Sequence, residues 1–360
     1  MSTDQPETSN GGIYYPTKPQ QFVELAPSEN TGMLIQSRTL AGYLPVPTAL
    51  DPQYTDVLSL NVLPMRGGDS LTALLDKPGV AVGTKLGMYG GFSTGRRSVK
   101  KKDSSLILAA LIFPSPDAAG KAAKALAEAG VSDDPDLPYK AVKLPNQPKG
   151  FGLQNPKTPS LQGFLASGSL VLYVYLAGER GENMTPKLPA VGSYLAALQK
   201  STASFKPVPK AKLKTLKLDP DGAYARALPN KKGDGTVYDG AWSAKAFLHA
   251  MGDYKADSEV FEQAKVDAVG SGRSTVYRAK DHAGAALVSA QFVRDLTASK
   301  PGYSPMAAPG GMEGVSCLRN TLEAKFYCTG AVGRYAFEYH AEDSEDLQRS
   351  LQSQVAVLSA

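Results

Sequence analysis

Apolar runs and helical spacings alternate along the first half of the chain. Residues 104–113 form an apolar run that predicts a buried strand, and residues 118–129 place small apolar side chains at helical intervals. Residues 163–177 predict two strands that meet near residue 168, and residues 191–199 predict a second helix. The predicted order is strand, helix, hairpin, helix. The first helix would bury Ala119, Ala122, Ala123 and Leu126.

The second half shows the same order. Residues 273–278 predict a strand, residues 279–296 a helix, residues 326–341 a hairpin and residues 344–358 a final helix. The final helix has apolar residues at helical spacing, namely Leu347, Leu351, Val355 and Leu358. The helix before it would bury a side that carries Leu287, Ala290 and Val293.

The two halves are therefore predicted to be copies of one unit, related by duplication. Hairpins that alternate with helices favour an α+β fold of two similar lobes, each an antiparallel sheet with helices packed on one face. A groove between the lobes is the expected binding site. The residues that correspond are Asp117 and Asp281, Gly120 and Gly284 (a shift of 164), and Gly168 and Gly333 (a shift of 165).

Composition sets the predicted boundaries. Residues 1–20 are polar and predict a flexible N-terminal tether, followed by an N-terminal lobe over residues 21–204. Residues 205–222 contain prolines and five lysines and predict an exposed linker. Residues 223–360 form the predicted C-terminal lobe.

Length and charge exclude several classes of protein. The chain has 360 residues, of which 42% are hydrophobic, enough for a core in each lobe. Its longest apolar run, residues 106–113, is far shorter than the roughly 20 residues of a membrane-spanning helix. The formal net charge of +5 is too small for a dedicated nucleic-acid binder.

The two cysteines, Cys317 and Cys328, are placed to form a disulfide. They lie eleven residues apart in two predicted strands, with a predicted turn at Arg319 and Asn320. Neighbouring strands bring such residues within the Cα separation that a disulfide requires. A disulfide implies an oxidising compartment, and the alternative is two buried thiols in a cytosolic protein.

Export normally needs an apolar signal segment, and residues 1–20 do not contain one. They resemble the flexible segment that follows the lipidated cysteine of a bacterial lipoprotein. In that interpretation Met1 stands where the cysteine was. An ordinary cytosolic N-terminus is the alternative interpretation.

No residue is assigned a catalytic role. Ser93 lies in a GxSxG string, which is typical of the nucleophile of α/β hydrolases, but the helix that should follow it is missing. A serine esterase that uses Ser93 is kept as an alternative function. The three histidines, His249, His282 and His340, show no HxH or HxxxH spacing, so no metal site or cofactor is expected.

Two groups of residues are candidate contact sites. One is a basic run that would lie against anionic phospholipid or phosphorylated wall polymers, although ordinary solvated charges are the alternative. The other is a set of tyrosines in period 2 that would form a platform for a sugar or an apolar ligand, with core packing as the alternative. Nucleic acid is disfavoured because no aromatic residues interleave the basic ones. The basic run is Arg96, Arg97, Lys100, Lys101 and Lys102, and the tyrosines are Tyr173, Tyr175, Tyr335 and Tyr339.

Several short strings are spread over nearly the whole chain. They are Tyr15-Pro16-Thr17, RTLAGY at 38–43, GFSTGRR at 91–97, DPDG at 219–222, GAWSAKAFLH at 240–249, VYRAKD at 276–281, Tyr327-Cys328 and Gly333-Arg334-Tyr335. In their order and spacing they resemble the uncharacterised actinobacterial cell-envelope lipoproteins that carry a paired domain of unknown function. The chain departs from the family at Trp242 and Ser243, where the family usually has Tyr and Gly. The resemblance implies secretion, an N-terminal lipid anchor and the cysteine pair, and it supplies no catalytic residues.

The sequence therefore predicts a non-enzymatic, secreted, lipid-anchored protein of the cell envelope. It would bind a glycolipid, a wall component or a partner protein near the groove between its lobes. Besides the Ser93 esterase, the alternative is a structural or accessory subunit of an envelope membrane complex.

Overall fold

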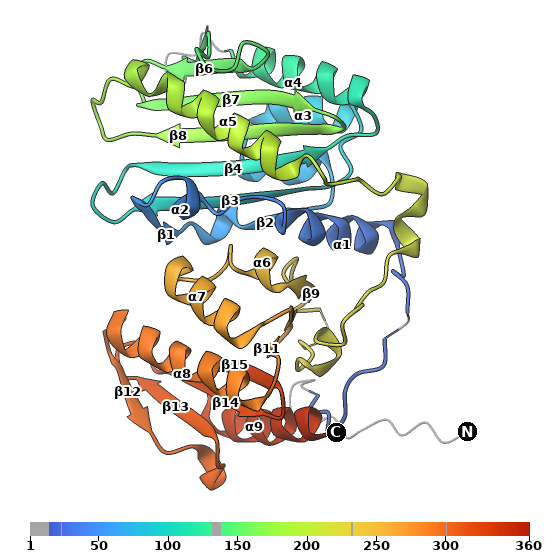
Figure 1. Cartoon of the computed structure of the whole chain (residues 1–360), viewed down its shortest axis with the longest axis vertical. Helices are drawn as coiled ribbons and strands as arrows, with labels where there is room; N and C mark the ends of the chain where they lie inside the picture. Colours follow the sequence, from blue (N-terminus) through green and yellow to red (C-terminus); the bar gives the residue numbers. More distant parts are fainter. Residues whose placement is uncertain (1–13, 23, 132–137, 232, 300) are drawn as a thin grey trace. The chain divides into compact units, whose positions relative to one another are not determined.

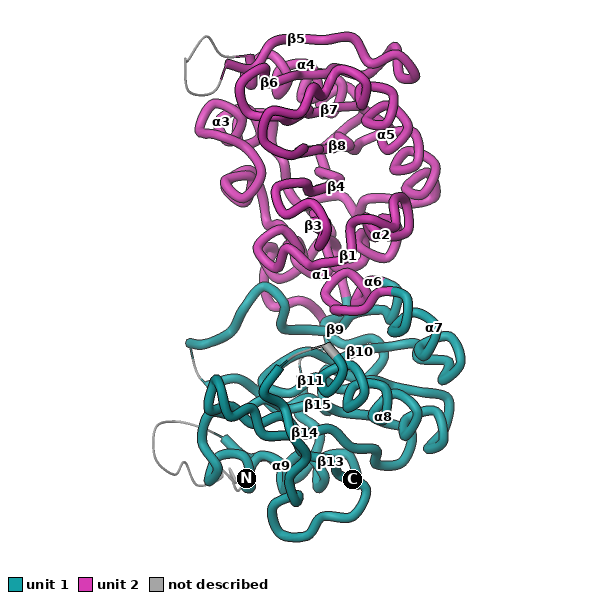
Figure 2. The backbone as a smooth tube through the Cα atoms, turned by 90° about the vertical axis from the view of Figure 1, so that its left-hand side faces the viewer, with its two compact units in different colours: residues 1–24, 217–245, 255–360 teal, residues 25–216, 246–254 magenta. Residues whose placement is uncertain are grey.

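The computed structural model describes residues 14–22, 24–131, 138–231, 233–299 and 301–360 (Figure 1). The chain forms two compact units, shown in separate colours in Figure 2. Unit 1 comprises residues 1–24, 217–245 and 255–360, and unit 2 comprises residues 25–216 and 246–254. Each unit is built on one antiparallel sheet, which confirms the predicted two-lobed α+β fold.

The sheet of unit 2 has eight strands in the order β1-β3-β4-β8-β7-β6-β5, with β2 paired to β3. All described strand pairs are antiparallel. The long apolar strands β4 and β8 lie in the middle, where both of their faces are covered, while β5 forms one edge. The strands are β1 Tyr54–Val57, β2 Leu63–Met65, β3 Gly91–Ser98, β4 Ser105–Ile112, β5 Lys140–Val142, β6 Phe151–Asn155, β7 Ser160–Ser167 and β8 Leu170–Ala177.

Helices cover both faces of this sheet, and not one face as predicted (Figure 1). On one face α4 buries Ala119, Ala122, Ala123 and Leu126, as predicted, against alternate residues of β4 and β8. On the other face Val191 and Leu195 of α5 lie against Gly163 of β7. The helices are α1 Glu29–Ala41, α2 Pro47–Leu50, α3 Lys77–Lys85, α4 Pro116–Gly130 and α5 Leu188–Thr202.

Unit 1 has a seven-stranded sheet in the order β12-β13-β14-β15-β11-β10-β9. It too has helices on both faces. Phe292 of α8 packs on the ring of Tyr277, while Gln354 of α9 accepts a hydrogen bond from Ser274 on the opposite face. The elements are β9 Gly240–Ser243, α6 Ala244–Phe247, α7 Tyr254–Ala264, β10 Ala268–Ser271, β11 Ser274–Arg278, α8 His282–Ser299, β12 Tyr303–Met306, β13 Val315–Asn320, β14 Lys325–Val332, β15 Tyr335–Ala341 and α9 Ser344–Ser359.

The two units repeat one topology. The order α3-β3-β4-α4-β5-β6-β7-β8-α5 corresponds to α7-β10-β11-α8-β12-β13-β14-β15-α9, and the strand orders correspond as well. Gly168 and Gly333 occupy equivalent two-residue hairpin turns with φ of 56° and 54°, a conformation that favours glycine. The predicted pairing of Asp117 with Asp281 is wrong by two residues, because the side chain that caps α4 is Ser115, whereas Asp281 caps α8.

Cys317 and Cys328 lie directly opposite each other in β13 and β14 and form the predicted disulfide. The turn between these strands spans residues 321–324, so the predicted turn at Arg319 and Asn320 is wrong. Both residues belong to β13. The pairing register, which the sequence does not specify, places the turn after them.

The predicted buried side of α8 is also wrong. Ala290 is exposed, and the helix buries Ala285, Val288 and Phe292. The predicted and the observed buried faces of α8 are offset by about one residue. The helix contains several small apolar residues, so the sequence alone is compatible with burial of either face.

The segments predicted as tether and linker pack on the units where they are described. Residues 1–13 of the predicted tether lie outside the described residues, whereas the backbone of Gln20 hydrogen bonds to Ala225 within unit 1. In the predicted linker, residues 210–215 form a 3₁₀ helix whose Leu213 is buried against α1. The boundary between unit 2 and unit 1 falls within this segment, after residue 216.

Candidate functional site

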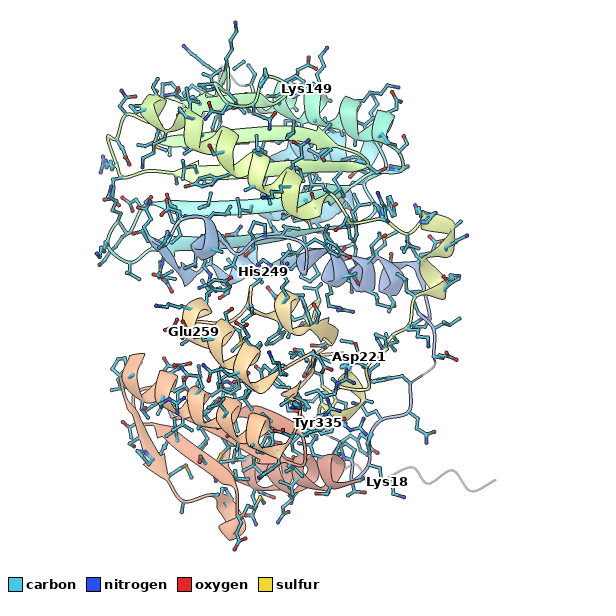
Figure 3. The ribbon with its side chains drawn as sticks, viewed as in Figure 1. Lys18, Lys149, Asp221, His249, Glu259 and Tyr335 are labelled. Carbon is cyan, nitrogen blue, oxygen red and sulfur yellow. A yellow bond between two sulfur atoms is a disulfide. The ribbon has the colours of Figure 1, made fainter. Side chains whose placement is uncertain are left out.

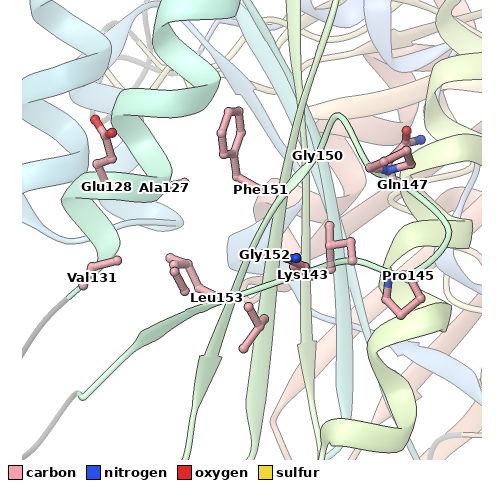
Figure 4. A pocket seen from close by; sticks show the side chains of 14 residues that line it. Ala127, Glu128, Val131, Lys143, Pro145, Gln147, Gly150, Phe151, Gly152 and Leu153 are labelled. Carbon is pink, nitrogen blue, oxygen red and sulfur yellow. The ribbon is translucent and has the colours of Figure 1, made fainter.

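An apolar groove of about 600 Å³ lies between the end of α4 and the β5–β6 edge of the unit 2 sheet (Figure 4). We call it the α4–β6 groove. Its volume falls within the range of small-molecule binding sites. The lining residues are Ala127, Glu128, Val131, Ala141, Val142, Lys143, Leu144, Pro145, Gln147, Pro148, Gly150, Phe151, Gly152 and Leu153.

Local sequence explains why a hollow forms here. Helix α4 ends at Gly130, where an added Cβ would lie 2.6 Å from Cδ1 of Leu153, so a glycine lets the helix end close to β6. Residues 143–150 then leave the edge strand β5 in a loop that contains Pro145 and Pro148, and they return to β6. The helix end, the edge of the sheet and this loop form three sides of the groove.

The groove exposes apolar side chains that a globular protein normally buries. Val131 is 46% exposed and Phe151 37% exposed, and both line the groove, as do the buried Leu144 and Leu153. Among the described residues, they are two of only six large apolar side chains that are exposed. Clustered exposure of this kind is typical of a binding surface.

Few polar side chains line the groove, and among them Glu128 and Lys143 carry opposite charges. Glu128 is paired with Lys124 across one helical turn, at 3.7 Å. Lys143 lines the groove, Lys140 lies three residues before it in β5, and Lys149, labelled in Figure 3, lies between the lining residues Pro148 and Gly150. The charged side chains that line the groove are therefore Glu128 and Lys143.

Arg96, predicted to contact an anionic surface, is fully buried. Its guanidinium donates hydrogen bonds to the backbone carbonyls of Thr55 at 2.6 Å, Met251 at 2.6 Å and Gly252 at 3.1 Å. The strand β3 turns this side chain inward and its neighbour Arg97 outward. Arg96 therefore cannot contact an anionic surface, and this part of the prediction is wrong.

The rest of the basic run lies at the turn between β3 and β4. Arg97 is exposed and pairs with Asp56, and Lys100, Lys101 and Lys102 are exposed in the turn. Contact of these lysines with an anionic surface stays a prediction.

The four tyrosines do not form a platform. Tyr173 and Tyr339 are 1% and 2% exposed and belong to the cores of their units, so they cannot present a face to a ligand. Tyr175 and Tyr335 are half-buried, and the Tyr335 ring lies 5.0 Å below the guanidinium of Arg226. Core packing, the alternative interpretation, describes Tyr173 and Tyr339 correctly.

Ser93 lies in the regular strand β3, is fully buried and donates a hydrogen bond to the backbone carbonyl of Asn61 at 2.7 Å. A hydrolase nucleophile instead occupies an exposed turn between a strand and a helix. His249, labelled in Figure 3, is buried and lies 3.0 Å from the carbonyl oxygen of Ala41. Neither position supports the esterase alternative.

A polar cluster in unit 1 holds residues of the N-terminal segment. Asp346 accepts hydrogen bonds from Tyr15 at 2.7 Å and from Tyr339, and it pairs with Arg273 at 3.0 Å. Partial burial alone would raise the pKa of Asp346, but the hydroxyls of Tyr339 and Tyr15 and the charge of Arg273 outweigh it, so this pKa lies below its ordinary value of 3.8. Arg273 also donates a hydrogen bond to the backbone carbonyl of Tyr14, so the cluster joins the N-terminal segment to α9, and we assign it a structural role.

Sequence reasoning missed the α4–β6 groove. No element or contact was predicted between residues 129 and 163. A usable signal was present, because residues 138–178 contain four lysines and no Asp or Glu. The neighbouring Asp133, Asp134 and Asp136 lie outside the described residues.

In the part of the chain that the structure describes, no helix is long and apolar enough to span a membrane. Within those same ranges, no three His, Cys, Asp or Glu side chains are grouped to hold a metal ion.

Two family models match consecutive parts of the chain. The model described as "Domain of unknown function (DUF7373) N-terminal" matches residues 23–218, and its C-terminal counterpart matches residues 224–360. No curated protein matches the chain. A solved structure, the extracellular domain of PknH from Mycobacterium tuberculosis, is similar over 46% of this chain and 96% of its own, with 10% identity and a TM-score of 0.31. A similarity this low says nothing about what either protein binds.

Proposed function

The chain belongs to the DUF7373 family, and from that premise we propose that it is a non-enzymatic protein of the cell envelope that binds the acyl chain of a lipid or glycolipid in the α4–β6 groove. It would act outside the cytosol and be attached to the membrane by an N-terminal lipid anchor. Its role is recognition of a ligand and not its chemical conversion.

The observation that carries this proposal is the apolar lining of the groove. Val131 and Phe151 expose apolar surface to solvent, which is unfavourable by about 25 cal/mol for each Å². An acyl chain seated on them would remove that surface from water. The groove volume of about 600 Å³ is sufficient for a chain of ordinary length.

The disulfide supports the proposed compartment. Cys317 and Cys328 are bonded, and such bonds are rare in cytosolic proteins, where thiols are kept reduced. The lipid anchor rests on the resemblance of residues 1–20 to a lipoprotein tether. Protein trapped with a maleimide as its native cells are lysed should show no labelled cysteine, and labelling of both without reduction would contradict an oxidising location.

Ligand binding is tested by calorimetric titration with lysophospholipids below the concentration at which they form micelles. We expect saturable binding of one molecule per chain. The double change Val131→Ser and Phe151→Ser should weaken it at least about tenfold, because each truncation removes roughly 1–2 kcal/mol of apolar contact.

Leu60→Ser is the matched control. Leu60 is 87% exposed in the same unit and does not line the groove, so its loss should leave the affinity unchanged. If neither lysophospholipids nor fatty acids bind, or if Leu60→Ser weakens binding as much as the groove variant, the proposal is wrong.

A further inference from the structure

We infer that the turn between β3 and β4 is a membrane contact, which lies on the anionic head groups of a lipid bilayer and inserts one apolar side chain among them. We call residues 98–104 the β3–β4 tip (Figure 1). The inference goes beyond the proposed function, because the tip shares no lining residue with the α4–β6 groove.

Three hydrogen bonds fix the backbone of the tip. The amide of Ser98 donates to the carbonyl of Ser104 at 2.9 Å, and the amide of Ser104 donates to the carbonyl of Lys101 at 2.9 Å. The amide of Lys101 donates to the hydroxyl of Ser98 at 3.2 Å. Ser98 and Ser104 are buried, whereas every residue from 99 to 103 is exposed. The tip therefore presents five consecutive side chains to solvent from an ordered turn.

The positive charges of the tip have no internal partner. Lys100, Lys101 and Lys102 are exposed, and in the part of the chain that the structure describes none of them forms an ion pair. Arg97, which precedes the tip, is paired with Asp56 and is therefore not counted. Three ammonium groups on adjacent residues repel one another, and an anionic surface would offset that repulsion.

The carboxylates beside the tip are engaged with protein groups. Glu179 accepts a hydrogen bond from the backbone amide of Asp103 at 3.3 Å. Glu182 pairs with Lys187 at 2.8 Å and accepts a hydrogen bond from the backbone amide of Glu179 at 2.9 Å. Within the tip itself, Asp103 is the acidic residue beside three lysines. The tip thus keeps a surplus of positive charge that faces solvent.

Val99 favours a lipid bilayer over a soluble polyanion as the partner. It is 64% exposed and directly precedes the three lysines. A phosphorylated polymer offers this side chain no apolar surface. At a bilayer the valine can enter the boundary between head groups and acyl chains, while the lysine ammonium groups stay at the level of the phosphates.

The test is co-sedimentation of the whole chain, without a lipid anchor, with vesicles. The vesicles consist of phosphatidylcholine alone or contain about one third phosphatidylglycerol, which gives them a negative surface. We expect at least about tenfold tighter binding to the anionic vesicles, because each lysine close to such a surface adds to the affinity. The preference should shrink at high salt, since the charges involved are exposed.

Two triple variants of equal net charge locate the contact. The tip variant replaces the three lysines of the tip with glutamine and should lose the preference. The control variant replaces three exposed lysines of unit 2 outside the tip and should keep it. All the replaced lysines are exposed, so both variants should fold. The substitutions are Lys100→Gln, Lys101→Gln and Lys102→Gln in the tip variant, and Lys85→Gln, Lys200→Gln and Lys206→Gln in the control.

A further variant, Val99→Ser, separates a lipid surface from a polymer. It should weaken binding to the anionic vesicles about threefold, because the apolar contact is lost. Binding to soluble polyphosphate should not change, since the lysines remain. If Val99→Ser has no effect on vesicle binding and polyphosphate binds as tightly as the vesicles, a phosphorylated polymer is the partner and the inference is wrong.

The remaining outcomes keep the inference separate from the proposed function. Equal binding to both kinds of vesicle, or a preference that survives in the tip variant, overturns the inference. The double change Val131→Ser and Phe151→Ser in the groove should leave vesicle binding unchanged, and loss of the preference there would move the contact from the tip to the groove. Titration of single lipids into the groove reports on the proposed function alone.

Discussion

Arg96 and Arg97 are adjacent in strand β3 and should respond in opposite ways to substitution. Arg96→Met leaves buried backbone carbonyls without a donor and should destabilise unit 2 by about 3 kcal/mol. Arg97→Met removes an exposed pair with Asp56 and should cost less than about 1 kcal/mol. Urea unfolding followed by circular dichroism measures both, and equal effects would contradict the assigned burial.

Asp346 provides a pH-dependent prediction for unit 1. Its depressed pKa means that the ionised form stabilises the fold above the ordinary value of 3.8, and that this contribution is lost as pH falls through the depressed value. Asp346→Asn should therefore be less stable than the parent chain at pH 7, by about 2 kcal/mol, and the difference should narrow below pH 3.8.

The single tryptophan, Trp242, lies in unit 1 and is 5% exposed, so its fluorescence reports the unfolding of that unit. A stability difference between Asp346→Asn and the parent chain that stays constant down to pH 3, or grows there, would show that the carboxylate does not stabilise the fold through its charge.

The directions of single side chains could not be predicted from the sequence motifs. The basic run at residues 96–102 was visible, but the direction of each side chain depends on the register of β3, which the sequence does not specify. Tyr173 and Tyr339 were correctly predicted to lie in strands. Only the helices packed against their strands decide that these rings are buried.

At the scale of elements, two glycines of unit 2 should respond oppositely to alanine. Gly120 lies inside α4 with open space around its Cα, so Gly120→Ala should stabilise by about 0.5–1 kcal/mol. Gly168 has φ of 56° in the turn between β7 and β8, so Gly168→Ala should destabilise by about 1 kcal/mol. Urea midpoints of the two variants measure this, and a shift in the same direction for both would refute the assigned backbone conformations.

Most elements were predictable because apolar runs and helical spacings are strong in α4, β4, β7 and β8. The number of covered faces was predicted wrongly, as one where the structure has two (Figure 1). In β4 almost every residue is apolar. A strand with one exposed face would have an apolar residue at every second position, so this pattern is typical of a strand buried on both faces. That pattern in residues 105–112 was available in the sequence and contradicts a sheet with one open face.

At the scale of the whole molecule, sequence domains and compact units differ in one segment. Residues 246–254 lie within the C-terminal family match, 224–360, yet they belong to unit 2, where Met251 and Gly252 accept hydrogen bonds from Arg96. A chain cut to residues 23–218 lacks these acceptors. We predict that it unfolds at a lower urea concentration than unit 2 of the full chain.

The same cut should change the effect of Arg96→Met. In the full chain the substitution costs about 3 kcal/mol, whereas in the shortened chain, where water reaches the guanidinium, it should be nearly neutral. Circular dichroism of the four proteins gives this double-mutant cycle. An equal cost in both backgrounds would show that residues 246–254 do not stabilise Arg96.

The α4–β6 groove could not be predicted because segments distant in the sequence form it. It is formed by a helix end, a sheet edge and a loop that lie up to 26 residues apart, between Ala127 and Leu153. No sequence motif indicates that these three segments come together. The absence of carboxylates over residues 138–178 shows the charge of that segment, and only the folded chain shows which apolar side chains line the groove.

Photocrosslinking with an acyl chain that carries a terminal diazirine tests the central claim most directly. After irradiation and digestion, peptide mass spectrometry locates the attached chain. We predict that labelling concentrates in residues 127–131 and 141–153, and that excess unlabelled lipid or the double change Val131→Ser and Phe151→Ser suppresses it. Labels spread over both units, or confined to other segments, would contradict a lipid site in this groove.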